Sequence, residues 1–168
     1  MIRCVFVLVA ALFLPILGAA QCLTTFAPNP PFVPPAQYHT DVPEGAFWYG
    51  TDQLWTALDF DGKWSMRDNV LHGKGYRTKL TFWSRSFDWH KEFEPRLVVV
   101  AKRLDVEAPS VVVAHANAVF IPRGGRVPTA GTVAPAMMMA IDIPTAGCWE
   151  VTAHYRGHTL PFIVSVEP

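Results

Sequence analysis

The chain of 168 residues carries 14 Lys and Arg residues against 14 Asp and Glu residues, so its formal net charge is zero. This balance argues against nucleic-acid binding, which needs a basic face to displace counterions from phosphates, and it provides no polybasic patch for an anionic membrane surface. The length is enough for one domain with a single hydrophobic core.

The first 20 residues have the pattern of a secretory signal peptide. Arg3 precedes an apolar run from Val5 to Leu17, and small residues occupy positions 18–20 at the expected cleavage site. The run is shorter than the ~20 apolar residues of a membrane span, and an uncleaved signal anchor is the alternative. We therefore expect removal of residues 1–20, which leaves 168 − 20 = 148 residues, and export to the periplasm or the extracellular space.

Two cysteines remain once Cys4 leaves with the signal peptide. In an oxidising compartment an even pair is most simply interpreted as one disulfide, here Cys22–Cys148. On the chain-entropy model, closing so long a loop stabilises a fold by up to about 4–5 kcal/mol. The alternatives are two separate thiols, or acylation of Cys22 as in bacterial lipoproteins, which would exclude the disulfide. Gln21 disfavours this lipid anchor, because a small residue normally precedes an acylated cysteine.

Residues 21–45 contain six prolines and form a predicted N-terminal arm. Proline favours an extended backbone and donates no hydrogen bond to a neighbouring strand. We therefore expect this arm to be a spacer or to lie along a sheet edge.

Short segments rich in β-branched and aromatic residues, separated by Gly, Pro, Asn and Asp, make up residues 46–168. Because they show no sustained helical periodicity, we expect an all-β domain, specifically one immunoglobulin-like β-sandwich. Asp61-Gly62 predicts a two-residue hairpin turn between segments 54–60 and 63–66. The other predicted strands are 46–50, 79–84, 96–104, 110–121, 133–143 and a closing hairpin.

The register of the closing hairpin can be predicted. Pairing Val151 with Phe162 places the apolar residues of both strands on one face, whereas a slip by one residue mixes the faces. The turn then lies around Gly157, because glycine readily adopts positive φ. This register turns Trp149 toward the core and Cys148 to the opposite face, where it can bond to the arm.

Segment 84–95, SRSFDWHKEFEP, gathers acidic, basic and aromatic residues between two strands. This composition fits a binding loop, and it also fits a hydrolase cleft that would use Asp88, His90 and Glu92. The sequence holds no nucleophile elbow, phosphate-binding loop, dinucleotide-binding glycine motif or paired C-x-x-C. We therefore assign no catalytic or cofactor-binding residue. The predicted binding residues are Trp83, Phe87, Trp89 and His90.

Two patterns are similar to metal sites. His154 and His158 have an H-x-x-x-H spacing, but across a hairpin it places them on opposite faces or in the turn. Asp59, Asp61 and Asp68 have a spacing similar to that of a calcium loop, which the Asp-Gly turn explains better. We therefore predict no metal site and no cofactor.

Four segments resemble a group of bacterial secreted or lipoprotein-like proteins, whose C-termini carry a Gly-Cys-Trp-Glu segment before a Phe-containing final strand. They are LWTALDFDGKW, KLTFWSRSFDW, LVVVAKRLDVEAP and PTAGCWEVTAHYRGHTLPFIVSV, within residues 54–166. No activity is assigned to that group, so the resemblance implies no catalytic residue. The last two strands are also similar to the end of bacterial immunoglobulin-like domains, which implies a sandwich.

We expect an exported, non-catalytic binding or structural module of the cell envelope, with an envelope protein or a glycan as partner. One alternative is a small secreted hydrolase or metal-dependent enzyme that uses the 84–95 loop. The other is a secreted protease inhibitor, because sandwiches present loops well.

Overall fold

The computed structural model describes residues 21–38, 41–65, 70–71, 75–122 and 133–168. Within these ranges the chain forms eleven strands and one turn of 3-10 helix. The elements are η1 (Ala36–Tyr38), β1 (Ala46–Thr51), β2 (Leu54–Asp59), β3 (Lys63–Ser65), β4 (Val70–Leu71), β5 (Gly75–Trp83), β6 (Val98–Arg103), β7 (Val111–Val113), β8 (Asn117–Pro122), β9 (Val133–Ile143), β10 (Gly147–Tyr155) and β11 (His158–Glu167).

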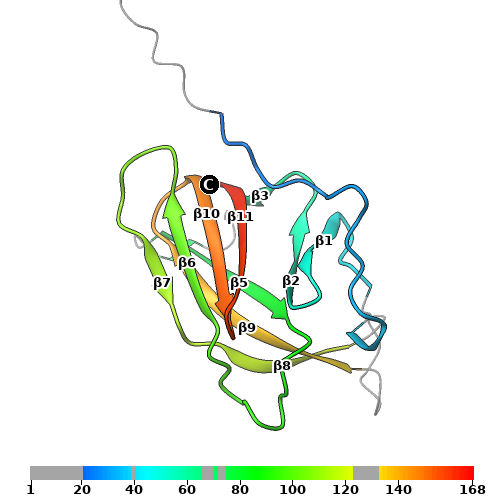
Figure 1. Ribbon diagram of the computed structural model, residues 1–168. Coiled ribbons are helices and arrows are strands. Elements are labelled where there is room, and N and C mark those ends of the chain that lie inside the picture. The colour runs from blue at the N-terminus through cyan, green and yellow to red at the C-terminus, as the bar shows by residue number, and fades with distance from the viewer. Residues whose placement is uncertain (1–20, 39–40, 66–69, 72–74, 123–132) are drawn as a thin grey trace, which may run out of the picture.

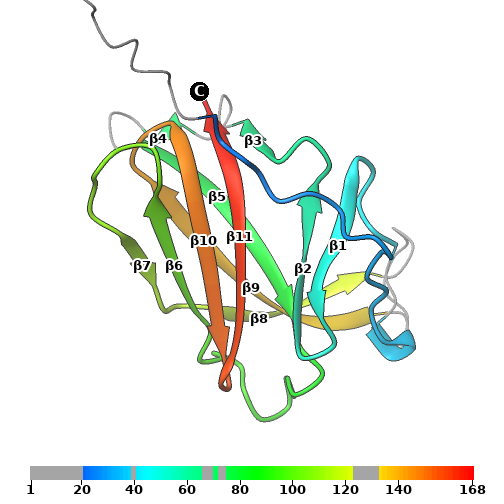
Figure 2. The same cartoon turned by 45° about the horizontal axis from the view of Figure 1, so that its top comes forward.

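The strands form two sheets that pack face to face (Figures 1 and 2). The first has the order β1-β2-β5-β9-β8, with β4 also paired to β5, and the second has the order β3-β11-β10-β6-β7. Pairing is antiparallel except between β3 and β11, which are parallel. The predicted all-β sandwich is confirmed. Among the described residues, no helix is long and apolar enough to cross a membrane.

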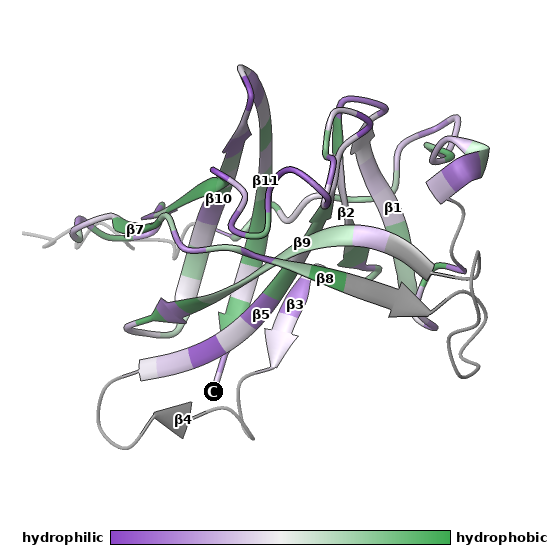
Figure 3. Cartoon of the chain, turned by 90° about the horizontal axis from the view of Figure 1, so that it is seen from below, coloured by the Kyte–Doolittle hydropathy of each residue, from purple (hydrophilic) through white to green (hydrophobic). Residues whose placement is uncertain are grey.

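The main core lies between the sheets, because alternate side chains of each strand point to one face. On β10, Trp149, Val151, Ala153 and Tyr155 are buried, and Phe162 of β11 packs among them. The alternation appears as green and purple bands along these two strands in Figure 3. The hydrophobic effect on this one face therefore fixes the sandwich.

The closing hairpin has the predicted register. Val151 lies opposite Phe162, and the pairing continues until only Arg156 and Gly157 remain as the turn. Their φ values of 47° and 80° are both left-handed, as a two-residue turn of this twist requires. The sequence alternation and the turn chemistry thus agree.

The predicted hairpin at Asp61-Gly62 is wrong. β2 belongs to the first sheet, while β3 pairs with β11 in the second, so this turn carries the chain from one sheet to the other. The Asp-Gly pair does form a tight turn, in which the Gly62 amide donates to the Asp59 carbonyl at 3.0 Å. Such a dipeptide specifies a change of direction but not the strand that pairs next. The first hairpin is instead β1–β2, with Thr51 opposite Leu54.

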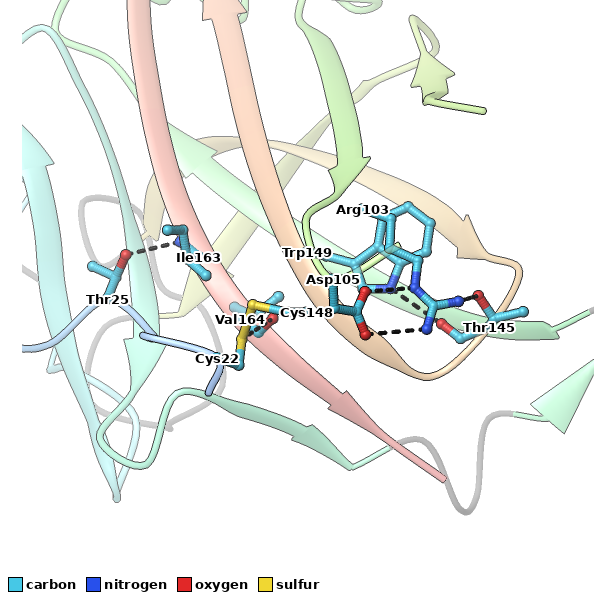
Figure 4. Close-up of a disulfide and its surroundings, with 9 residues drawn as sticks. All are labelled: Cys22, Thr25, Arg103, Asp105, Thr145, Cys148, Trp149, Ile163 and Val164. Atoms are coloured by element: carbon cyan, nitrogen blue, oxygen red, sulfur yellow. Dashed lines mark hydrogen bonds and ion pairs between the residues drawn. A yellow bond between two sulfur atoms is a disulfide. The ribbon is translucent and has the colours of Figure 1, made fainter. Parts of the chain in front are cut away.

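The disulfide between Cys22 and Cys148 is present, with an S–S distance of 2.07 Å and Cα atoms 5.4 Å apart (Figure 4). It fixes the arm along the outer edge of β11. There the Thr25 amide donates to the Ile163 carbonyl at 2.9 Å, and the Ile163 amide donates to Thr25 Oγ1 at 2.8 Å. The arm therefore lies along a sheet edge, and the Cys22 sulfur in this state has no free valence for a lipid.

A polar cluster surrounds the indole of Trp149 beside this disulfide (Figure 4). The buried Trp149 Nε1 donates to the Thr145 carbonyl at 3.1 Å. Arg103 donates to Asp105 Oδ1 at 2.7 Å and to Thr145 Oγ1 at 2.8 Å. The start of β10 is thus held by covalent, ionic and hydrogen bonds together.

The arm also covers a second apolar cluster on the outer face of the first sheet. Trp48, Trp55 and Trp83 form this cluster with Ala136, and Phe32, Tyr38 and Val42 of the arm pack against it. The Tyr38 and Trp55 rings meet edge to face, with centroids 5.3 Å apart. The described residues of the arm therefore contribute to the packing of the domain.

Candidate functional site

The loop between β5 and β6 is fastened to the turn of the closing hairpin. Arg156 Nη1 donates to the Ser86 carbonyl and Nη2 to Glu92 Oε1, both at 2.7 Å. The Tyr155 hydroxyl donates to Glu92 Oε2 at 2.6 Å. Both segments lie at the same end of the molecule (Figures 1 and 2). We call residues 84–95 together with the turn residues 156–157 the loop–hairpin surface.

The charges at these contacts are complementary. Burial acts to raise the pKa of Glu92, but hydrogen bonds from Tyr155 and Arg156 outweigh it and bring the pKa below its usual value. Burial, followed by the bond to Glu92, raises the pKa of Tyr155 well above the usual value for a phenol. At neutral pH, Glu92 is therefore a charged acceptor and Tyr155 a neutral donor. Both groups hold the loop in place.

Two of the four predicted binding residues are buried. Trp83 and Phe87 are each 5% exposed. Trp83 packs edge to face on Trp48 under the arm, with centroids 5.1 Å apart, and Phe87 packs on Tyr155 at 6.4 Å. These rings anchor the first part of the loop to the two apolar clusters, so the expectation that they form an exposed surface is corrected.

The other two lie at the surface. Trp89 and His90 stack with ring centroids 3.6 Å apart and an interplanar angle of 33°. Trp89 is half-buried against the main core, while His90 is exposed. The sequence prediction omitted Phe93, which is 70% exposed. The signal for it was an aromatic residue between Glu92 and Glu94, a setting that is unusual for a core position.

The surface next to Phe93 is a shallow depression of mixed charge. It is lined by Lys91, Glu92, Phe93, Glu94, Arg96 and Arg156. The loop backbone at Phe93 is hydrogen-bonded to β8 of the first sheet, because the Ala118 amide donates to the Phe93 carbonyl at 2.8 Å. An exposed aromatic ring among charged side chains on a fixed loop can contact a protein or a sugar ring.

Acid–base chemistry by Asp88, His90 and Glu92 finds little support in these contacts. Asp88 Oδ1 accepts from the His90 amide at 3.1 Å, and Oδ2 pairs with Lys91 Nζ at 2.8 Å. The bond from Lys91 is the main cause that lowers the pKa of Asp88. Within the described ranges, no hydrogen bond joins the His90 imidazole to either carboxylate. Both carboxylates stabilise the loop.

The histidine pair lies as the register predicts. His154 is opposite Thr159 and His158 is opposite Tyr155, so the two imidazoles are on different faces. His154 Nδ1 and Thr159 Oγ1 are 3.1 Å apart. Among the residues that can be described, no three His, Cys, Asp or Glu side chains group to hold a metal ion; Asp68 lies outside those residues.

No family model matches this chain, and neither the curated proteins nor the solved structures give a match. The proposals below therefore rest on the sequence and the geometry.

Proposed function

We propose that this protein is an exported, non-catalytic binding module of the cell envelope, and that the loop–hairpin surface contacts its partner, an envelope protein or a glycan. The signal-like residues 1–20 and the Cys22–Cys148 disulfide support export, since disulfides persist in oxidising compartments. This proposal is in line with the resemblance to secreted bacterial proteins.

The single observation that carries the binding role is a fixed loop with aromatic rings on its outer side. Arg156 and Tyr155 hold Glu92, while Trp89, His90 and Phe93 lie toward the surface. Binding residues are commonly placed on loops that a rigid scaffold positions. Aromatic residues and Arg are enriched at interfaces, and aromatic rings bury a large contact area at low entropic cost.

We further propose that the sandwich is immunoglobulin-like. Such domains have sheets of order A-B-E-D and C-F-G, with C′ beside C in the variable type. The orders β2-β5-β9-β8 and β11-β10-β6-β7 correspond to A-B-E-D and G-F-C-C′. The 84–95 loop would then be the B–C loop and the 156–157 turn the F–G loop, which carry binding residues at one end of variable domains.

Two departures from that family are clear. The disulfide joins the arm to β10 and does not bridge the sheets, and the buried Trp149 lies on β10, the position of strand F. The correspondence therefore concerns strand order, and it does not by itself fix function.

A photo-reactive amino acid placed at position 93 tests the binding role in cells. Position 26 provides a matched control, because Phe26 is 79% exposed and Phe93 is 70% exposed. We expect a specific cross-linked envelope product from position 93 and none from position 26. His90→Ala should weaken that product. If the two positions give the same products, the surface is not a selective binding site.

The enzyme alternative has its own test. Hydrolysis of esters, glycans or peptides by the purified protein, abolished in His90→Ala and Glu92→Ala, would replace the binding proposal. The inhibitor alternative gains no observation of its own from the described residues.

A further inference from the structure

The first sheet opens between β2 and β5. These strands pair only at Trp55–Trp83 and Thr56–Phe82, and beyond that point they diverge (Figures 1 and 2). β2 diverges because its far end leads into the turn to the second sheet. A cleft of about 330 Å³ lies in the opening. We call it the β2–β5 cleft; it is lined by Pro43, Ala46, Thr56–Asp59, Trp64, Thr78–Thr81 and Trp83.

Among the residues that the structure describes, the edge of β5 that borders this cleft is incompletely paired. β4 covers the same edge only at Gly75 and Tyr76, so residues 77–81 have no strand neighbour there within the described chain. The Thr81 carbonyl faces the cleft, because it accepts from Thr56 Oγ1 at 2.8 Å. Peptide groups alternate in direction along a strand, so those of Arg77 and Lys79 face the same side.

This edge has the backbone geometry that strand addition requires. The opposite side of the same residues is already paired, with Arg77 opposite Asp142 and Lys79 opposite Ala140 of β9. Two N–H groups and two C=O groups, from Arg77 and Lys79, are therefore held in extended geometry without a strand partner among the described residues. An added peptide strand forms its main-chain bonds with such an edge.

The side walls of the cleft are mostly apolar. Leu58 and Leu80 are buried at its inner side, and Trp64 is half-buried. Trp83 also lines the cleft and is 5% exposed. The cleft therefore offers apolar contacts to an incoming segment.

One end of the cleft is acidic. Asp59 and Trp64 also line an adjoining depression together with Glu44, Asp61 and Lys63. Lys63 is neutralised by Glu167 at 2.7 Å. Partial burial, followed by repulsion from Asp61, raises the pKa of Asp59, which is the direction expected for a carboxylate without a cation beside it. This end therefore favours a basic side chain.

We infer that the β2–β5 cleft binds an extended peptide segment of a partner protein, which adds as a strand along residues 77–81 of β5 and places a Lys or Arg side chain beside Asp59. This site is separate from the loop–hairpin surface. The inference does not depend on the function proposed for that surface.

Amide hydrogen exchange on the full mature chain tests the open edge. The amides of Arg77 and Lys79 should exchange at least about tenfold faster than those of Thr78 and Leu80, which face β9. Equal protection of all four amides would overturn the inference, because the edge would then already be covered by the chain itself.

Binding is tested with a phage-displayed library of random heptapeptides, selected on the same protein. We expect enriched peptides that alternate apolar and polar residues and contain Lys or Arg, and whose synthetic forms protect the Arg77 and Lys79 amides from exchange. No enrichment, or protection elsewhere only, would overturn the inference. The protection measurement uses the unaltered chain and so does not depend on the folding of any variant.

Two pairs of variants separate main-chain pairing from charge. Lys79→Pro removes the N–H and is compatible with a sheet edge, whereas Lys79→Ala keeps the N–H. We expect about tenfold weaker peptide binding for Lys79→Pro and a change of less than about threefold for Lys79→Ala. Asp59→Asn should weaken binding, while Glu107→Gln, an exposed carboxylate far along the chain, should not. Equal affinity in Lys79→Pro and Lys79→Ala would overturn the strand-addition mode.

Discussion

The two ends of the closing hairpin are held by different chemistry. Where β10 begins, Cys148 is joined covalently to the arm. At the turn, Tyr155 and Arg156 bind Glu92 of the loop through hydrogen bonds of 2.6 and 2.7 Å. The disulfide at the first end depends on the redox state of the solution. The contacts of Glu92 at the turn depend on pH and salt and do not depend on redox state.

This difference matches the roles that we assign to the two ends. The disulfide end fixes a long arm that covers an edge of β11 and the outer tryptophan cluster, so it mainly contributes to stability. The polar end positions an exposed loop, so it mainly contributes to the shape of the proposed binding surface. Each end can be altered separately, and the expected effects differ in size.

Breaking the disulfide should give the largest effect. Cys22→Ser releases a constraint on a loop of more than a hundred residues, for which the chain-entropy model gives up to about 4–5 kcal/mol. We expect Cys22→Ser to lower the free energy of unfolding by about 2–5 kcal/mol in urea denaturation. Cys148→Ser and the reduced wild-type protein should lose the same amount.

The cross-linking pattern from position 93 should persist in Cys22→Ser under conditions where the variant is folded. A stability loss below about 1 kcal/mol would instead mean that the noncovalent contacts of the arm, such as those of Thr25, hold it without the disulfide.

Altering the turn should have a smaller effect on stability. Gly157 has a φ of 80° and open space around it, so a Cβ there would meet only backbone strain. We expect Gly157→Ala to cost about 1–2 kcal/mol, the usual penalty for a left-handed alanine. Gly45 is a matched control, because its φ is 79° and its surroundings are equally open.

Gly45→Ala should cost a similar amount in urea denaturation, but only Gly157→Ala should change cross-linking from position 93. If both variants leave the cross-links intact, the turn does not position the loop.

The sequence predicts the closing hairpin well because its pattern is long and regular. Seven positions of β10, from Trp149 to Tyr155, alternate in polarity, and a slip by one residue would place Val151 and Phe162 on opposite faces. The disulfide was also predictable, because only two cysteines follow the signal-like segment. In both cases the local pattern and the global fold require the same arrangement.

The candidate site was predicted only in part, because exposure depends on contacts that are distant in sequence. Trp83 faces away from the main core and would be exposed if Tyr38 and the rest of the arm did not cover its cluster. Likewise β3 has three residues, too few for a pattern that could predict its pairing with β11. The sequence therefore located the loop at 84–95 and the turn at Asp61-Gly62 correctly. It did not predict which residues pack against the loop or which strand pairs with β3.

The smallest expected effect is the pH dependence of the polar end. The folded-state pKa of Glu92 is lowered, so its contribution is fully present above the ordinary glutamate pKa of about 4.3 and is lost as the pH falls through the folded-state value. Because this ion pair is partly exposed, we expect a contribution of at most about 1 kcal/mol. Glu92→Gln should therefore be less stable than wild type at pH 7, and this difference should shrink toward pH 3 in chemical denaturation.

Glu94→Gln provides the control, since Glu94 is exposed and forms no ion pair with the described residues. Its difference from wild type should stay small and nearly constant over the same range. If the difference in unfolding free energy between Glu92→Gln and wild type does not change with pH, the charge on Glu92 does not contribute to stability through Arg156. The loop would then be held by the packing of Phe87 on Tyr155, and the charge on Glu92 would not contribute to its position.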